Sequence, residues 1–472
     1  MTGCGLHHEV FTANLKNDEI IGHQVVVIRG TVTGGICDAG RGEVLDTETG
    51  IRRDFQLTKG NVFKVLWSLR AGTNRIRINY CTATVNFNLI YHETANQYRV
   101  QPLYIVCQGH DGHFNEESGK SNSPEEACKK IVLGLKLVQC LYAEKLLEHD
   151  QSRKTFTLIE NCHIFRSKLS AEAAKKLDEN ALWNEFAREL LNSEFGEDEK
   201  LKFVAFIGCT EYEEIADGDY SYENIKRHTK AQANLGGGGL ALFGSGYLYC
   251  WPSEFDDILP YFENSKRIDL KNFLDDSNYR RTYGGCYATT IGAVCHELGH
   301  IFDLGHTEEG IMGNGFDYVN LVFTSKHLTE DLPNRIIDST NQKDRRLTAI
   351  KRPGKFLQKY HEQKTGDSTF FTRNCAIILS LHRWINPENS LYSETDTIEL
   401  SEYPLSVSCT SSHLRLIEIR DKQSNLVVDY QELGVSSAAA GELRSVNLSN
   451  RLDPSRHSLF VITSNGSSKF FA

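Results

Sequence analysis

The sequence predicts a multidomain fold in which an α/β (α+β) domain lies between two all-β, sandwich-like domains. Short β-branched or aromatic runs occupy both ends of the chain, whereas strand-like and helix-like runs alternate in the middle. With 472 residues, of which 40% are hydrophobic, the chain is long enough to bury several cores. We place the three domains at residues 1–97, 98–390 and 391–472.

The N-terminal domain is predicted from four runs between Val25 and Tyr91. These runs read VVVIRGTV, VFKVLWSL, NRIRINYC and VNFNLIY, and turns rich in Gly, Asn and Lys separate them. Alternation of apolar and polar residues within such runs is typical of strands that bury one face. We therefore expect a β-sandwich.

Strands and helices alternate from about Tyr98 onward. The run LYIVC is typical of a buried strand, and Ser123 followed by Pro124 marks the start of a long helix. Apolar residues such as Ile131 and Leu135 recur in that helix at helical spacing. Strand-like TFTLIE, helix-like NALWNEFARELL, strand-like KFVAFIGC and glycine-rich LALFGSGYLYCW follow. This order predicts an α/β or α+β domain.

The C-terminal domain is predicted from a return to strand-like runs after about Leu391. The runs LRLIEIRD, NLVVDYQEL and SLFVITS are again short and β-branched. Neither an internal repeat nor a long low-complexity linker separates the three parts. We expect the domains to pack directly against one another.

Composition excludes several classes of protein. The net charge is −10 and no stretch concentrates Lys and Arg, which argues against a nucleic-acid partner. No secretory leader and no run of about 18 apolar residues occurs, so we expect no membrane segment. The 13 cysteines lack CxxC pairs, which favours free thiols in a reducing compartment. We expect a cytoplasmic location, with nuclear entry left open, and the oligomeric state is not predicted.

The chemistry is concentrated in the stretch CHELGHIFDLGHTEEGIMGNG. His296 and His300 lie four residues apart, so on a helix they occupy the same face and can bind one metal ion. Glu297 adjoins the first ligand and can reach a water molecule on that metal. Catalytic zinc takes three protein ligands and leaves its fourth position to water. A third ligand is therefore required.

His306, ten residues after His296, is the candidate third ligand. In a chain of this composition HExxH arises by chance about 0.04 times, and the extra histidine multiplies that figure by roughly another 0.04. Met312, the only methionine after the initiator, follows six residues later. The combination predicts one zinc ion per chain, with His296, His300 and His306 as ligands and Glu297 as the catalytic base.

The same stretch resembles a known family of peptidases. HELGHIFDLGHTEEGIM resembles the metzincin zinc peptidases, whose pattern is HExxHxxGxxH followed by a Met-turn. The flanking GGGGLALFGSGYLYCWP and GIMGNGFDY are similar to a family of zinc metallopeptidases of fungi and invertebrates, and the likeness covers roughly Gln101 to Pro387. The resemblance implies a metzincin-like catalytic domain with Met312 in the Met-turn. It also implies that the glycine-rich strand Leu240–Tyr247 lies along the cleft and pairs with an extended substrate.

The sequence departs from the metzincin pattern at Asp303, which stands where those enzymes have glycine. Either Asp303 adopts the left-handed conformation, at a cost of about 1–2 kcal/mol, or the turn shifts to Gly305. Asp303 as a ligand in place of His306 is an alternative. Met312 as ordinary core filler is another, and so is a purely structural pair of helix histidines. Tyr318 is a candidate for stabilising an oxyanion.

Two functions of different classes fit these residues. The first is a zinc-dependent endopeptidase that hydrolyses peptide bonds with a metal-activated water and a glutamate general base, acting on a peptide or protein substrate. The alternative is a non-catalytic zinc-containing scaffold whose β domains recognise a partner or glycan. A metal hydrolase that acts on something other than peptides shares the site. Glu297 discriminates the classes, because zinc binding does not need it.

Overall fold

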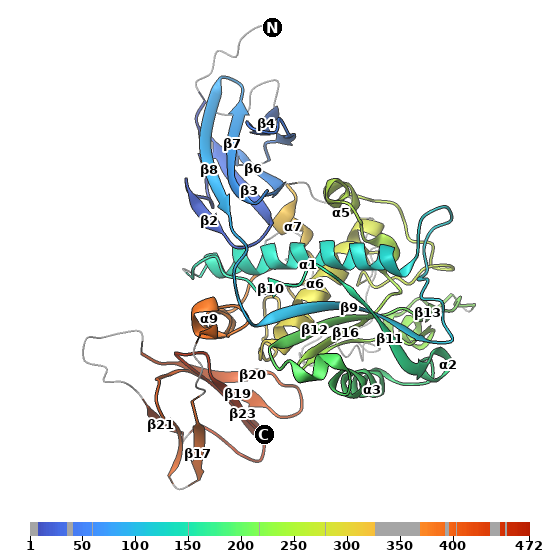
Figure 1. The fold of residues 1–472 in the computed structure, drawn as a ribbon, viewed down its shortest axis with the longest axis vertical. Helices are drawn as coiled ribbons and strands as arrows, with labels where there is room; N and C mark the ends of the chain where they lie inside the picture. The colour runs from blue at the N-terminus through green and yellow to red at the C-terminus, as the bar shows by residue number, and fades with distance from the viewer. Residues whose placement is uncertain are drawn as a thin grey trace.

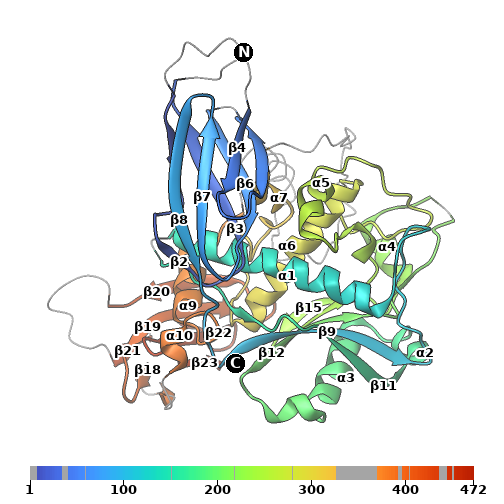
Figure 2. The same ribbon diagram turned by 45° about the horizontal axis from the view of Figure 1, so that its top comes forward.

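The fold is described from a computed structural model of the full chain. The description covers residues 8–34, 41–58, 60–149, 151–216, 218–278, 280–325, 369–391, 396–402, 404–434, 444–448 and 451–472. Figures 1 and 2 show three parts: an N-terminal β module, a central α/β layer structure and a C-terminal β module.

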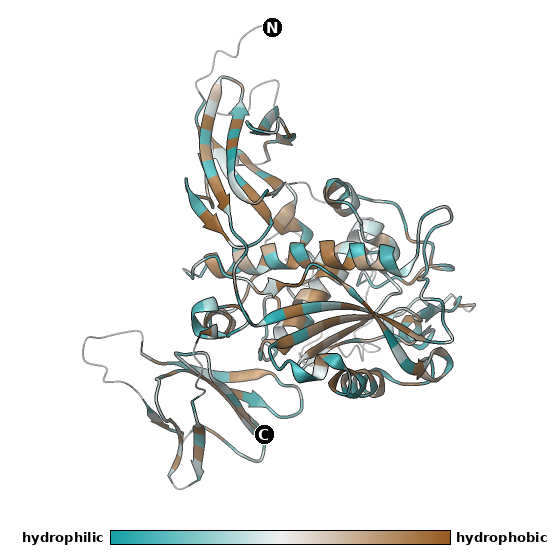
Figure 3. Ribbon diagram, in the orientation of Figure 1, coloured by the Kyte–Doolittle hydropathy of each residue, from teal (hydrophilic) through white to brown (hydrophobic). Residues whose placement is uncertain are grey.

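The N-terminal module is a sandwich of two sheets. One sheet has the strand order β1-β3-β6 and the other β2-β8-β7-β4-β5. The strands are β1 (Val10–Thr12), β2 (Glu19–Ile21), β3 (Val25–Val32), β4 (Arg41–Asp46), β5 (Arg52–Gln56), β6 (Val62–Ser68), β7 (Gly72–Tyr80) and β8 (Ala83–Tyr91). Apolar and polar residues alternate along β7 and β8 (Figure 3), as expected for strands that bury one face.

Strand β3 begins with an unbroken apolar run because both of its faces are buried. Val26 and Ile28 belong to the sandwich core, whereas Val25 and Val27 face the other way into the main core of the molecule. The second face packs against α1 (Pro124–Leu147). Because both faces of β3 are buried, alternation disappears there.

The central part is a six-stranded, mostly parallel sheet. Its strand order is β10-β9-β12-β16-β15, and β11 pairs with β9 beyond the end of β10. Only β15, at one edge, runs antiparallel to its neighbour among these strands. The strands are β9 (Arg99–Gln108), β10 (Thr157–Leu158), β11 (His163–Ser170), β12 (Leu201–Ile207), β15 (Asn234–Gly237) and β16 (Leu240–Gly244); β13 (Glu211–Tyr212) and β14 (Thr229–Lys230) form a separate pair.

Helices cover both faces of this sheet (Figure 1). Tyr104 and Phe206 point into the core shared with α1 and α6, whereas Ile105 and Ile207 point into the core shared with α3. The helices are α1, α2 (Ala171–Ala174), α3 (Glu179–Leu191), α4 (Tyr222–Arg227), α5 (Ile258–Phe262), α6 (Tyr283–Ile301) and α7 (Asn320–Phe323), with 3-10 turns η1 (Glu194–Glu197), η2 (Leu248–Cys250) and η3 (Phe255–Asp257). The predicted strand and helix alternation is therefore present.

The C-terminal module has two sheets and two preceding helices. The sheets have the orders β17-β18-β21 and β20-β19-β22-β23. The elements are α9 (Arg373–Leu381), α10 (Pro387–Ser390), β17 (Ile398–Glu402), β18 (Leu405–Cys409), β19 (Leu414–Asp421), β20 (Val427–Glu432), β21 (Ser445–Asn447), β22 (His457–Thr463) and β23 (Ser468–Phe471). The multidomain α/β plus all-β class predicted from sequence matches this arrangement.

All three parts contribute residues to one shared apolar cluster. Val25 and Leu66 of the N-terminal module, and Leu416 and Phe460 of the C-terminal module, belong to the same apolar cluster as α1 and α6. The expected direct packing of the modules is thus present, and the boundaries at residues 97/98 and 390/391 remain predictions.

Two further expectations concern the described residues. Nine of the 11 cysteines among them are buried free thiols. No described helix is long and apolar enough to cross a membrane.

Candidate metal centre

Helix α6 carries the first two histidines. Thr282 caps its N-terminus by accepting a hydrogen bond from the Gly285 N–H at 3.0 Å. His296 and His300 then lie one turn apart, with their rings at 4.8 Å between centroids. The helix is buried along nearly its whole length, so the rest of the protein holds these histidines rigidly.

The turn after α6 depends on Asp303. The helix ends at Ile301, and Asp303 adopts a positive φ of 67°. Of the two geometries that the sequence left open, the chain uses the left-handed aspartate. Gly305 serves a different purpose: a Cβ there would lie 2.8 Å from the Arg420 Nε atom. The reversal brings His306 back towards the helix.

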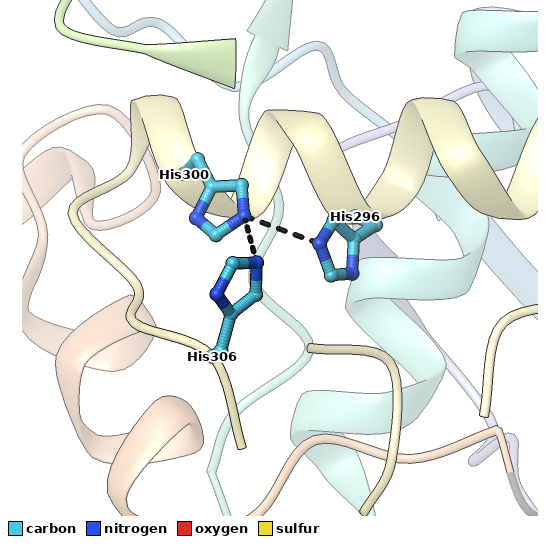
Figure 4. Close-up of side chains that lie close together, drawn as sticks. All are labelled: His296, His300 and His306. Atoms are coloured by element: carbon cyan, nitrogen blue, oxygen red, sulfur yellow. Dashed lines mark hydrogen bonds between the residues drawn. The ribbon is translucent and has the colours of Figure 1, made fainter. Parts of the chain in front are cut away.

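The three histidines converge (Figure 4). The Nε2 atom of His300 lies 3.1 Å from the Nε2 atoms of both His296 and His306. The three candidate ligand atoms all lie within 4.8 Å of one another, and they form the single group of this kind among the described residues. Zinc–nitrogen bonds of 2.0–2.1 Å in tetrahedral geometry separate two nitrogens by roughly 3.3 Å. The spacing therefore fits a zinc ion.

The tautomer of each ring is set by its second nitrogen. Each Nδ1–H donates to a backbone carbonyl oxygen: His296 to Ile311 at 2.7 Å, His300 to Leu304 at 2.9 Å and His306 to Ser424 at 2.7 Å. Because a carbonyl can only accept, Nδ1 carries the proton and the Nε2 lone pairs face one another. Such an arrangement is favourable with a cation between the rings.

Burial keeps two of these imidazoles neutral. It lowers the pKa of His300 well below its ordinary value, and the neighbouring His296 and His306 add to this effect. Burial also lowers the pKa of His306, although the hydrogen bond to the Ser424 carbonyl opposes the shift. Neutral imidazoles are the metal-binding form, so the donor set fits zinc on chemical grounds as well.

Glu297 lies in the same cavity as the histidines. Its Oε2 atom accepts a 2.7 Å hydrogen bond from the Gly236 N–H of β15. Gly236 packs so closely on α6 that a Cβ would lie 2.2 Å from the Glu297 carbonyl oxygen. The glycine at this position is therefore required by close backbone approach.

The expectation for strand Leu240–Tyr247 is wrong. Strand β16 covers only Leu240–Gly244 and is internal, because it pairs with β12 on one side and β15 on the other. The cleft edge is instead β15 (Asn234–Gly237). The short glycine-rich β15 has no apolar alternation, so sequence periodicity did not reveal it as a strand.

The cavity around the histidines has a volume of about 520 Å³. Leu235 and Gly236 line one side, Met312 and Phe316 another, and Asn425 of the C-terminal module closes it. A second hollow of about 310 Å³ continues the cleft past His300 toward the C-terminal module. The space is large enough for several residues of an extended peptide.

Met312 is buried beside α6 and lines the cavity. A Cβ on Gly299 would lie 2.4 Å from the Met312 Sδ atom, so the two segments are in direct contact. The neighbouring Ile311 carbonyl orients His296, as described above. Ile311 and Met312 thus both contact the part of α6 that carries the two histidines.

Two predicted residues point elsewhere. The Asp303 carboxylate accepts a 2.8 Å hydrogen bond from the Ser468 Oγ–H and lies 3.6 Å from the His382 Nε2 atom. Burial acts to raise the pKa of Asp303, but His382 and other partners outweigh it and hold the pKa below its usual range. Tyr318 is buried under the guanidinium of Arg280 and is outside the residues that line the cavity. Neither side chain joins the three histidines.

Sequence reasoning missed the C-terminal contribution. Ser424, Asn425 and Arg420 contact the segment that carries His306, more than a hundred residues away in sequence. Nothing in the run LRLIEIRDKQSN distinguishes it from any other strand followed by a turn, so no local signal could have identified these contacts.

The chain is similar to known peptidase sequences. A family described as "Putative peptidase family" matches residues 9–374. One relative, described as "Putative zinc metalloproteinase" of Saccharomyces cerevisiae, is 28% identical over 301 residues, which is 56% of this chain and 42% of the relative. A second of the same description, from Schizosaccharomyces pombe, is 26% identical over 247 residues, or 47% of this chain and 38% of the relative. The matches thus span about two-fifths of these relatives' own length.

Proposed function

Because the chain belongs to the family described as "Putative peptidase family", we propose that it is a metzincin-like, zinc-dependent endopeptidase. His296, His300 and His306 bind one zinc ion and Glu297 is the general base. The observation that carries the proposal is the convergence of three Nε2 lone pairs beside a carboxylate in one open cavity. The descriptions of the two fungal relatives as zinc metalloproteinases support the same reading.

Each residue has a distinct role in this proposal. When bound, zinc supplies a Lewis acid that polarises the scissile carbonyl and lowers the pKa of water. Glu297 accepts the proton of the attacking water and returns it to the leaving nitrogen. The Gly236 N–H holds the Glu297 carboxylate through its Oε2 atom, so that the base is oriented before substrate enters. Met312 packs beneath the histidines.

The substrate is a peptide or protein that binds in extended form along β15. This strand ends the sheet order, and its residues Asn234, Leu235 and Gly236 line the cavity. The N–H groups of Asn234 and Gly236 at that edge already donate to the Glu179 and Glu297 carboxylates, so an added strand would pair through the carbonyl oxygens. Such main-chain pairing gives affinity with little dependence on sequence. Side-chain preference would then come from the cavity walls.

The test is hydrolysis of a broad peptide library by the full chain, with products identified by mass spectrometry. Glu297→Gln should retain one zinc per chain and lose activity by about 10²–10⁴-fold, the usual contribution of a general base. Equal cleavage by wild type and variant would remove Glu297 from the mechanism.

The scaffold alternative makes a different prediction in the same experiment. It requires a full zinc site with no cleavage of any peptide across a range of pH. The position of Glu297 in the cavity favours the enzyme, since none of the three histidine rings needs its carboxylate for orientation. Hydrolysis of esters but not peptides would identify the remaining alternative, a hydrolase of another class.

A further inference from the structure

The C-terminal module contacts the segment that carries the third histidine. The His306 N–H donates to the Asn425 carbonyl at 2.9 Å, and the Val427 N–H donates to the His306 carbonyl at 2.8 Å. Together with the Ser424 carbonyl that accepts from His306 Nδ1, these bonds form a short parallel β-bridge between His306 and Leu426. Neither His296 nor His300 has its Nδ1 bonded by this module.

The turn that makes these bonds is ordered by Asp421. Its Oδ1 atom accepts from the Gln423 N–H at 3.1 Å, the Ser424 N–H at 2.9 Å and the Ser424 Oγ–H at 2.8 Å. Asn425 follows with a positive φ of 55°. An aspartate that accepts from the backbone two and three residues on is the usual way to fix such a turn.

Arg420, next to this turn, forms a hydrogen bond with Asp303. Its side chain is nearly inaccessible, and its Nη2 atom donates to the Asp303 carbonyl at 2.6 Å. Nε and Nη2 also donate to the Glu418 Oε2 atom, at 2.8 and 2.6 Å, and the guanidinium lies 4.5 Å from the centroid of the Phe460 ring. Glu418 is fully buried, so the pair is held in one geometry.

The contacts of Arg420 explain two features of the motif. Its bond to the Asp303 carbonyl holds the residue with the left-handed backbone, and its side chain fills the space beside Gly305. Both residues belong to the reversal between His300 and His306. The Arg420 guanidinium is held by Glu418 and donates to the Asp303 carbonyl. This hydrogen bond offsets the cost of the left-handed backbone and so stabilises the strained turn.

We propose that Arg420 and the Asp421–Leu426 turn are positioning elements of the metal centre, so that the C-terminal module is an integral part of it. This inference rests on the proposed function in one respect, namely that the three histidines bind zinc. The family match ends at residue 374 and does not include these elements. Outer contacts that orient metal-binding histidines typically contribute 10–100-fold to metal affinity.

The first test compares variants of Arg420 in the full chain by zinc competition with a chelator of known affinity. Arg420→Met should raise the zinc Kd about 10–100-fold. Arg420→Lys, which keeps the charge and one donor, should restore most of the affinity. Arg451→Met is the matched control: Arg451 lies in the same module but pairs with Asp429, away from the cleft. Its zinc Kd should equal that of the wild type.

The second test avoids the buried ion pair and decides the matter if Arg420→Met does not fold. Asp421→Ala removes the acceptor that orders the turn, whereas Asp421→Asn keeps an oxygen in the same place. The alanine variant should bind zinc more weakly and the asparagine variant like the wild type. Absorption of the Co²⁺-substituted proteins should change with loss of the third imidazole, which loss of stability alone does not cause.

The outcomes separate the two proposals. If the wild type binds no zinc, the proposed function is wrong. If the wild type binds zinc and the folded Arg420→Met and Asp421→Ala variants bind it equally tightly, the positioning role is wrong while the zinc site stands.

Discussion

The carboxylate of Glu297 accepts a 2.7 Å hydrogen bond from the backbone N–H of Gly236, which joins the candidate base to the edge strand of the sheet. This contact connects the orientation of the Glu297 carboxylate with the strand that lines the cavity. The same glycine that orients the carboxylate also belongs to the strand along which a substrate would lie.

Substitution of Gly236 should therefore disturb catalysis more than zinc binding. In Gly236→Ala the new Cβ would lie 2.2 Å from the Glu297 carbonyl oxygen, so β15 or α6 must shift. Misplacement of a catalytic group by about 1 Å typically costs about 10²-fold in rate. We expect a loss of this size in kcat/KM with zinc content unchanged. Gly239→Ala is the control: Gly239 lies in the turn between β15 and β16, a Cβ there would meet nothing within 4 Å, and the variant should behave as wild type.

The left-handed backbone of Asp303 should be measurable as strain. Asp303→Ala and Asp303→Gly both lose the bonds to Ser468 and His382, but only alanine has a Cβ in this conformation. Urea unfolding should show Asp303→Ala to be less stable than Asp303→Gly by about 1–2 kcal/mol. Equal stabilities would mean that the turn relaxes once the carboxylate is gone.

Zinc should stabilise the folded protein, because it replaces a close contact between lone pairs with three bonds. At free zinc about 100 times Kd the expected gain is about 2.7 kcal/mol, visible as a higher Tm. A chelator should reverse the shift. His306→Ala should lose both the shift and the stoichiometric metal in elemental analysis, and full zinc retention by that variant would refute the three-histidine site.

His23 should make stability depend on pH. Burial, with a smaller contribution from the charge of Arg153, lowers the pKa of His23 from 6.5 to about 3. Between pH 6.5 and about 3, the His23 imidazole is therefore protonated in the unfolded state and neutral in the folded state. Above pH 6.5 this difference does not affect the free energy of unfolding. As the pH decreases from 6.5 towards 3, it lowers the free energy of unfolding by roughly 1.4 kcal/mol per pH unit.

Urea unfolding at several pH values between 7.5 and 4.5 measures this dependence. His23→Leu should flatten the profile relative to the wild type, because leucine does not titrate. His92→Leu removes an exposed histidine of the same module and should leave the profile unchanged. An unaltered slope in His23→Leu would show that His23 is accessible to protons in the folded state.

Local sequence was sufficient for much of the fold. Alternation in β7 and β8, the Ser123 and Pro124 signals at the start of α1, and the spacing of His296 and His300 each report a structure formed by residues close in sequence. The left-handed aspartate was one of two geometries that the sequence allowed. Contacts from outside the motif, through Arg420, Ser468 and His382, hold the aspartate in this geometry.

The amino-acid sequence by itself determined which imidazoles and which carboxylate are available at the site, and that two of the three histidines lie on one helical face. Tertiary structure alone decided which strand forms the cleft edge and which residues hold His306. Strand order depends on pairing between distant segments, which periodicity does not encode. The carbonyls that orient the rings are common to every residue type, so their role arises from position in space and not from side-chain identity.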